Sequence, residues 1–143
     1  ASARDDLPRD EVEGLRKLYK KRLIAFNQAG PKGEGIAAQE FAGKGYQILE
    51  QGFRAAGGEI DLIAQKGNIL AFIEVKTAAT SHFGDPESWV PPAKQRQIGR
   101  IAQAYLQAHP SPNQTLRFDV VAIHLNQNPP RVHHIENAFR LER

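Results

Sequence analysis

Two short apolar runs separated by a turn stand in the middle of the chain, in residues 57–77 (GGEIDLIAQKGNILAFIEVKT). Both runs are rich in Ile, Leu, Val and Phe, which favour strands. Between them, Lys66-Gly67-Asn68 is a typical hairpin turn signal. The pattern therefore predicts an antiparallel β-hairpin with Gly67-Asn68 as its two-residue loop.

The loop also predicts the register of this hairpin, because the residues that flank a two-residue loop pair with each other. Counting back along both strands sets Asp61 opposite Glu74, and Glu59 opposite Lys76. Side chains alternate between the two faces of a strand. We therefore expect these four charged groups on one face of the hairpin. The other face should carry the apolar side chains Ile60, Leu62, Ile73 and Val75.

Two carboxylates then face each other across the hairpin. Asp61 opposite Glu74 should destabilise it by roughly 0.2–1 kcal/mol, unless a cation compensates. Carboxylate oxygens are ligands that Mg²⁺ prefers, and Lys76 on the same face could hold an attacking water or neutralise charge on a phosphate. The pattern predicts a site for Mg²⁺ or Mn²⁺. The alternative is a solvated hairpin face with one ion pair, since charged residues are common on exposed strand faces.

Hydrophobic periodicity predicts the other elements. Apolar residues at helical spacing indicate helices over residues 10–28, 32–44 and 94–109. Further strands are expected over residues 46–53, 116–125 and 131–135. Together with the hairpin, these elements predict one α/β domain, 9–143, behind a flexible leader, 1–8: a mixed central sheet of about five strands flanked by helices.

The composition is that of an ordinary soluble globular protein. Of 143 residues, 41% are hydrophobic and 24% are charged, which argues against disorder. The absence of cysteine excludes disulfides, thiolate zinc sites and a cysteine nucleophile. No apolar run is long enough to span a membrane and no signal-peptide core is present, so a cytoplasmic protein with no membrane partner is expected. A net charge of +3 permits a polyanionic partner without requiring one.

The motifs in the chain resemble a known family. Asp61, followed after the hairpin turn by Glu74-Val75-Lys76, looks like the D…(D/E)-x-K core of the PD-(D/E)XK restriction-endonuclease-like nucleases. Four stretches in order along the chain are similar to the bacterial YraN-like family: GEIDLIA, FIEVKT, RFDVVAI and HHIENAF. The resemblance covers about residues 32–139. It implies a restriction-endonuclease-like fold and a metal-dependent nuclease site related to Holliday-junction resolvases, in a family that is largely uncharacterised.

The resemblance also implies roles for particular residues. In related nucleases an acidic residue from the preceding helix faces the hairpin carboxylates. Glu34 is therefore expected to join Asp61 and Glu74 in the metal shell, with Glu40 as the weaker candidate. Lys76 would position the attacking water. Another explanation for Glu34 is its place near a helix N-terminus, where the helix dipole favours an acidic side chain.

Three cationic residues are candidates for contacts with nucleic acid. Lys94 and Arg96 begin the helix that follows the hairpin, and Arg54 precedes the hairpin. For each of them the alternative explanation is an ordinary exposed residue that contacts no nucleic acid. The partner they imply is nucleic acid, with DNA expected first and branched DNA included. The sequence leaves open whether the protein forms a homodimer.

Two departures from the family pattern keep other functions open. Ala78 stands where family members often have Arg, and Gln51-Gly52 where they often have Arg-Asn. Both changes remove polar or cationic groups near the expected site. The alternatives to a nuclease are therefore a nucleic-acid-binding module with little or no catalysis, and a structural or partner-binding domain whose hairpin charges are only solvated.

Three other features have structural explanations. Asp119 lies within an apolar strand and is expected to make structural hydrogen bonds. Trp89 is expected to close the edge of the core, with stacking on a base as the alternative. His133 and His134 point to opposite faces of a strand, so we do not expect them to form a zinc site with His124.

Overall fold

A computed structural model describes residues 29–78, 90–110 and 112–140 of the chain. Its elements are, in order, helix α2 (Ala29–Gly43), strands β1 (Gln47–Ala55), β2 (Gly58–Lys66) and β3 (Ile69–Ala78), helix α3 (Pro92–Ala108), and strands β4 (Thr115–His124) and β5 (Arg131–Ile135). Each described element matches a predicted one to within a few residues. The predicted leader 1–8, the helix 10–28 and Trp89 lie outside the described residues.

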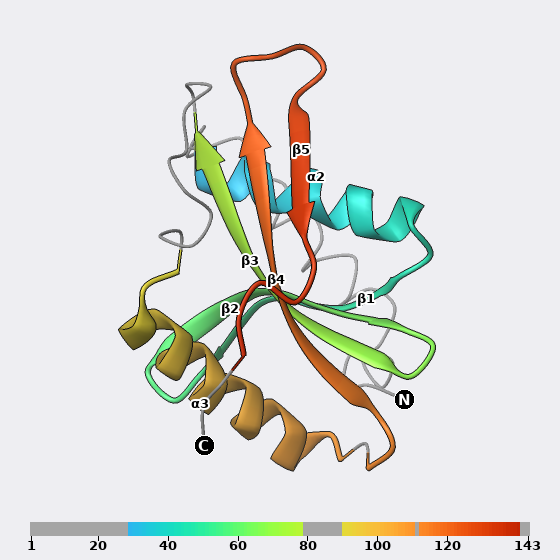
Figure 1. The fold of residues 1–143 in the computed structure, drawn as a ribbon, viewed down its shortest axis with the longest axis vertical. Coiled ribbons are helices and arrows are strands. Elements are labelled where there is room, and N and C mark those ends of the chain that lie inside the picture. Colours follow the sequence, from blue (N-terminus) through green and yellow to red (C-terminus); the bar gives the residue numbers. More distant parts are fainter. Residues whose placement is uncertain (1–28, 79–89, 111, 141–143) are drawn as a thin grey trace, which may run out of the picture.

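The five strands form one mixed sheet in the order β1-β2-β3-β4-β5. Strands β1, β2 and β3 are antiparallel neighbours, β3 and β4 are parallel, and β5 is antiparallel to β4. A parallel pair needs a crossover connection, and α3 provides it. Helices α2 and α3 cover opposite faces of the sheet, with α2 behind it and α3 in front in Figure 1. The structure confirms the predicted single-domain α/β fold, which is consistent with a restriction-endonuclease-like fold.

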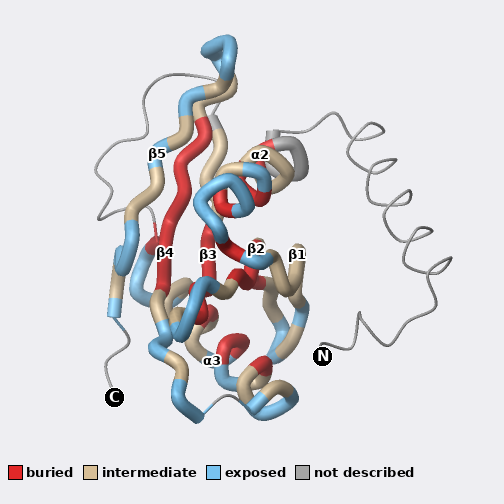
Figure 2. Tube along the Cα trace, turned by 90° about the vertical axis from the view of Figure 1, so that its right-hand side faces the viewer, coloured by how far each residue is buried: buried red, intermediate tan, exposed pale blue. Residues whose placement is uncertain are grey.

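The alternation of side chains along the strands divides the core into two layers. The layer under α3 contains Phe72 and Phe118 from the sheet and Ile98, Ile101 and Tyr105 from the helix. The layer under α2 contains Ala37 and Phe41 from the helix and Leu62, Ile73, Val121 and Ile123 from the sheet. Strand β4 contributes to both layers, and Figure 2 shows its central part buried. Burial on both faces explains its almost continuous apolar sequence. No described helix is long and apolar enough to cross a membrane.

Helix α2 ends at Gly43, and the glycine two residues later caps it. Gly45 has a φ of 93°, a left-handed conformation that glycine adopts without steric cost. Its N–H donates to the Ala42 carbonyl and the Tyr46 N–H donates to the Phe41 carbonyl, which is the pattern of a Schellman motif. The rings of Phe41 and Tyr46 then pack edge to face, 4.9 Å apart. This cap directs the chain from α2 into β1.

The predicted hairpin register is confirmed near its turn. Lys66 pairs with Ile69, and Gly67 in the loop has a φ of 59°. The β2–β3 ladder continues to Leu62 opposite Ile73 and ends there. The pairs predicted beyond that point are therefore not part of the ladder.

Two predicted positions in the hairpin are wrong. Ile60 packs in the layer under α3, although Leu62 packs under α2, so the two do not share a face. Glu59 has Arg54 of β1 as its ladder partner rather than Lys76. The alternation of side chains in β2 is interrupted at Asp61, opposite Gly52 of β1, which has a left-handed φ of 67°. Such irregularities increase the local twist, and beyond Leu62 the start of β2 pairs with β1 alone.

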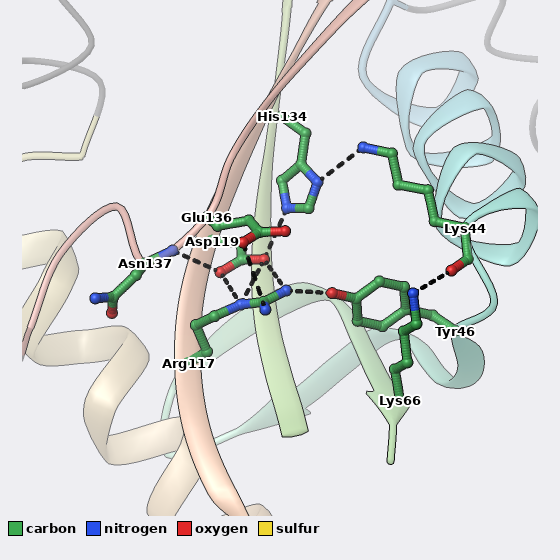
Figure 3. Close-up of polar contacts among 8 residues, drawn as sticks. All are labelled: Lys44, Tyr46, Lys66, Arg117, Asp119, His134, Glu136 and Asn137. Carbon is green, nitrogen blue, oxygen red and sulfur yellow. Dashed lines mark hydrogen bonds and ion pairs between the residues drawn. The ribbon is translucent and has the colours of Figure 1, made fainter. Parts of the chain in front are cut away.

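Asp119 has the structural role predicted for it, at the centre of the polar network in Figure 3. Its side chain is completely buried in β4. The carboxylate accepts hydrogen bonds from Arg117 Nη2 at 2.8 Å and the Asn137 backbone N–H at 2.9 Å, and lies 2.8 Å from His134 Nε2. Burial alone would raise the pKa of Asp119, but the hydrogen bonds from His134 and Arg117 hold that pKa below its ordinary value.

The network joins four elements through these contacts. Arg117 also donates a hydrogen bond to the hydroxyl of Tyr46, the residue before β1. Lys44 follows α2 directly, and its Nζ lies 3.1 Å from His134 Nδ1 of β5. A buried carboxylate with several charge-assisted partners costs much to disturb, because any partner left behind keeps a buried charge. The network therefore stabilises the junction of α2, β1, β4 and β5.

We expect Asp119→Asn to lower the free energy of unfolding by roughly 3–5 kcal/mol, because the Arg117 guanidinium loses its buried counter-charge. Urea denaturation at pH 7 measures the change. The matched control is Glu136→Gln, an exposed partner 3.8 Å from the same guanidinium, for which a change within about 1 kcal/mol is expected.

The Asp119 contribution should also depend on pH. Because the pKa of Asp119 is lowered in the folded protein, the stabilisation is present above the unfolded pKa and is lost as the pH falls through the folded one. The difference in free energy of unfolding between the parent and Asp119→Asn should therefore shrink as the pH falls. Equal stabilities of the two proteins at pH 7 would contradict the role of the network.

Candidate active site

Three carboxylates from two elements converge beside the start of β2. Glu34 comes from α2, and Glu59 and Asp61 come from β2. One oxygen of each lies within 4.8 Å of the others, and all three residues are partly buried. The predicted pairing of Glu34 with Asp61 therefore has a matching geometry. The weaker candidate, Glu40, instead forms an exposed ion pair with Lys44 at 3.7 Å.

A glycine brings α2 close enough to the sheet for this convergence. Gly33 is buried, and a Cβ added to it would overlap the Thr77 side chain of β3. Any larger residue at this position would push the first turns of α2 away from β3. The close approach places the neighbouring Glu34 at the carboxylate cluster.

Glu59 is the residue of this cluster that the sequence analysis did not assign to the site. Its carboxylate lies against the β1 backbone, where a Cβ added to Gly52 would be 2.9 Å from Glu59 Oε1. On its outer side, Arg54 Nη2 approaches Glu59 Oε2 at 3.5 Å. The available signal was its position two residues before Asp61 on the same strand. Arg54, predicted to contact nucleic acid, is thus an exposed neighbour of the cluster.

Asp61 joins the cluster to Glu74. Asp61 Oδ2 accepts a hydrogen bond from the Val75 backbone N–H at 2.7 Å, just past the end of the β2–β3 ladder. Glu74 is 9% exposed and its Oε2 has no hydrogen-bond partner among the described residues. Burial, then the hydrogen bond and charge repulsion from Asp61, raise the pKa of Glu74 to about 8. Near neutral pH, Glu74 therefore keeps its proton and can donate it to Asp61.

Two lysines lie near Glu74. Lys94 Nζ, from the first turns of α3, is 3.6 Å from Glu74 Oε2, and this contact becomes an ion pair when Glu74 ionises. The charges of Lys94 and Lys76 both oppose the rise of the Glu74 pKa, which places the two ammonium groups within electrostatic reach of the carboxyl group. A buried acid between two cations can take and return a proton near neutral pH.

The structure thus assembles most of the predicted site residues. Those near one another are Glu34, Arg54, Asp61, Glu74, Lys76 and Lys94. The compact three-carboxylate group consists of Glu34, Glu59 and Asp61, whereas Glu74 joins it through Asp61. Arg96 is exposed and lines a separate cavity between α3 and β4.

Comparison with known sequences assigns this chain to a family. Residues 33–123 match the uncharacterised protein family UPF0102, a range that includes every carboxylate of the site. A UPF0102 protein from Geobacter sulfurreducens is 43% identical over 113 residues, covering 78% of this chain and 88% of its own length. A UPF0102 protein from Geobacter metallireducens is 41% identical over 112 residues, covering 78% of this chain and 92% of its own length.

A further relative extends the match. A UPF0102 protein from Caldanaerobacter subterraneus subsp. tengcongensis is 41% identical over 128 residues, covering 87% of this chain and all of its own length. The family is uncharacterised, so the match by itself assigns no activity. With these relatives and a family match over most of its length, the chain belongs to the uncharacterised protein family UPF0102, as its YraN-like motifs predicted.

Proposed function

We propose that this protein hydrolyses phosphodiester bonds in nucleic acid with the help of a divalent cation, Mg²⁺ or Mn²⁺. The observation that carries the proposal is the convergence of oxygens from Glu34, Glu59 and Asp61 to within 4.8 Å of one another. Carboxylates held together repel one another and destabilise the fold unless a cation compensates. Crowded carboxylates and buried acids with a raised pKa, such as Glu74, cluster at functional sites.

The residues present fit Mg²⁺ or Mn²⁺. All the donors are carboxylate oxygens, the ligand type these hard cations prefer. Ligands at about 2.1 Å from Mg²⁺ lie up to about 4.2 Å apart on opposite sides, so oxygens within 4.8 Å need only small side-chain movements. The buried Glu74 Oε2 without a hydrogen-bond partner among the described residues offers a further oxygen next to Asp61.

Each residue has a role that follows from its position. Glu34, Glu59 and Asp61 would hold the cation, which supplies Lewis-acid activation of water and phosphate when bound. Glu74 supports Asp61 and can accept or donate a proton near pH 8. Lys76 orients the attacking water or offsets charge developing on the phosphate, as a compact ammonium can.

A nucleic-acid-binding module without catalysis is the second candidate function. Two contacts favour it: Arg54 already pairs with Glu59, and Lys94 lies beside Glu74. Cations of the chain itself therefore compensate part of the acidic charge. DNA is the substrate to test first in either case, with nicked, branched and single-stranded forms compared.

The first test is DNA cleavage with Mg²⁺ or Mn²⁺ by the parent and by Asp61→Asn and Lys76→Ala. We expect cleavage by the parent and none detectable for Asp61→Asn, and a loss of about 10²- to 10³-fold for Lys76→Ala, the size expected when one group that stabilises developing charge is removed. Glu40→Gln, a carboxylate on the same helix as Glu34 but outside the cluster, should cleave like the parent. Salt-dependent DNA binding without cleavage would instead establish the binding module.

The second test separates metal binding from chemistry by thermal or urea unfolding. At a Mn²⁺ concentration about a hundred times the Kd, the parent should gain roughly 2.7 kcal/mol of stability over the protein in EDTA. Asp61→Asn should gain much less, because it loses a ligand. Lys76→Ala should gain as much as the parent, because its ammonium does not coordinate the cation. Identical unfolding of the parent in EDTA and in millimolar Mn²⁺ would rule out the metal site.

The third test follows the protonation of Glu74 in metal-free buffer. Between pH 4.5 and about 8 the unfolded state releases the Glu74 proton while the folded state keeps it. The stability of the parent should therefore fall as pH rises through this window. Glu74→Gln has no such proton to lose. Its free energy of unfolding should therefore exceed that of the parent by an amount that grows from near zero at pH 4 to about a few kcal/mol at pH 8.

Glu40→Gln is the control for this pH experiment, because it makes the same substitution at an exposed acid outside the cluster. A stability difference between the parent and Glu74→Gln that does not change with pH would show that Glu74 ionises normally and is not held in a buried acidic site.

A further inference from the structure

A cavity of about 890 Å³ lies between α3, the start of β4 and the segment after β5. Figure 1 shows this segment running from the end of β5 back alongside α3. Ligand sites commonly have volumes of about 300–1,000 Å³. The cavity is thus large enough to hold more than a single phosphate group.

The shortness of β5 leaves this space open. Strand β5 pairs with Val120–His124 of β4, so the first half of β4 has no strand beside it on that edge in the described part of the chain. The following segment is held there by two hydrogen bonds from its backbone, from the Ala138 N–H to the Phe118 carbonyl at 2.7 Å and from the Asn137 N–H to the Asp119 carboxylate at 2.9 Å. The edge is covered loosely enough to leave a hollow.

The cavity has an apolar floor. Phe139 stacks on Phe118 at 5.2 Å and remains partly exposed. Leu106 of α3 and Leu116 of β4 also line the cavity, and Leu116 is the large hydrophobic residue that the described chain leaves most exposed, at 42%. An aromatic ring and two leucines at the surface of one cavity form a platform for a flat, apolar group.

The rim of the cavity is cationic. Arg96, Arg100 and Arg140 line it, and no acidic residue does so within the described chain. None of these three arginines forms an ion pair in the part of the chain that the structure describes. Arg117 also lines the cavity, but its guanidinium is bound to Asp119. Three cations without an ion-pair partner among the described residues, set around an apolar floor, call for a ligand with both anionic and flat apolar parts.

We propose that this cavity binds single-stranded nucleic acid, with phosphates on Arg96, Arg100 and Arg140 and a base on Phe139 and Leu116. Sites for single strands combine cationic side chains along the backbone with aromatic or apolar surfaces under the bases. A duplex is the poorer fit, because its bases are already stacked and paired and can offer only phosphates to the rim.

The cavity is connected to the carboxylate site through α3. Lys94 of that helix contacts Glu74, and Arg96 and Arg100 lie roughly 3 and 9 Å further along the helix axis, at 1.5 Å per residue. A strand leaving the carboxylate site along α3 would reach the cavity within a few nucleotides. The choice of nucleic acid as ligand rests on the proposed function, but binding in the cavity needs neither the cation nor catalysis.

Fluorescence anisotropy of a labelled oligothymidylate in EDTA, where no cleavage can occur, tests this proposal. The double variant Arg96→Gln/Arg100→Gln should bind at least tenfold more weakly than the parent at about 50 mM salt. Its slope of log K against log salt should fall by roughly 0.7 for each phosphate that the variant no longer binds. Arg131→Gln, which removes an exposed arginine of β5 outside the cavity, is the control and should bind like the parent.

A second variant tests the apolar floor. Phe139→Ala should weaken binding of the single strand by roughly 5- to 100-fold, the range for removal of one stacking interaction, without lowering the salt slope. If this variant unfolds, the arginine variants still decide the question, because their side chains lie at the surface.

Several outcomes would overturn the cavity proposal: no binding of the single strand by the parent, the same affinity for the double variant and Arg131→Gln, or equally tight binding of a duplex of the same length. The two proposals fail separately. Binding that depends on Arg96 and Arg100, without cleavage in Mn²⁺, supports the cavity and removes the nuclease. Cleavage by the parent with unchanged binding by the double variant supports the nuclease and removes the cavity.

Discussion

The hydrogen bond from the Val75 amide to the Asp61 carboxylate is the contact on which the site depends. The backbone ladder between β2 and β3 ends at Leu62 and Ile73, and the start of β2 pairs with β1 alone. The Asp61 side chain then does what a backbone carbonyl would do in a regular hairpin, and it satisfies an amide of β3. The same contact holds one carboxylate beside Glu74 and within reach of Glu34 and Glu59.

The clusters around Asp119 and Asp61 differ in how their charge is compensated. Around Asp119, cationic and neutral donors satisfy one buried carboxylate, and its pKa is lowered. Around Asp61, several carboxylates share a small volume, and the pKa of Glu74 is raised. A satisfied buried charge stabilises a junction, whereas crowded acids store unfavourable energy that a bound cation would release. The first arrangement suits structure and the second suits chemistry.

Local sequence signals predicted much of the fold and part of the site. The Gly67-Asn68 turn predicted the hairpin and its register near the loop, because a tight turn depends on a few adjacent residues. The convergence of Glu34 with Asp61 followed from the family resemblance. Its structural cause, the close packing of Gly33 on Thr77, joins residues 44 positions apart and could not be read from local pattern.

The two errors in the hairpin lie where the alternation of side chains in β2 is interrupted, opposite the left-handed Gly52 of β1. Strict alternation set Ile60 on the wrong face and paired Glu59 with Lys76, whereas the irregular β1 aligns Glu59 with Arg54. Side chains alternate between faces only in a regular strand, and the alternation pattern of the sequence does not show where a strand becomes irregular. The separation of Lys94 from Arg96 likewise depends on how α3 is rotated against the sheet, because only Lys94 approaches Glu74.

The partial pairing of β4 has a consequence for association between copies of the protein. The start of β4 is an exposed sheet edge, and such an edge, with a hydrophobic residue such as Leu116 beside it, can add a strand from another molecule. Two copies brought together there would set the cavity arginines Arg100 and Arg140 of one copy near those of the other. Like-charge repulsion at a short, weakly covered edge discourages such pairing. The same guanidinium groups would therefore keep the protein from aggregating through β4 while the edge stays open to a polyanion.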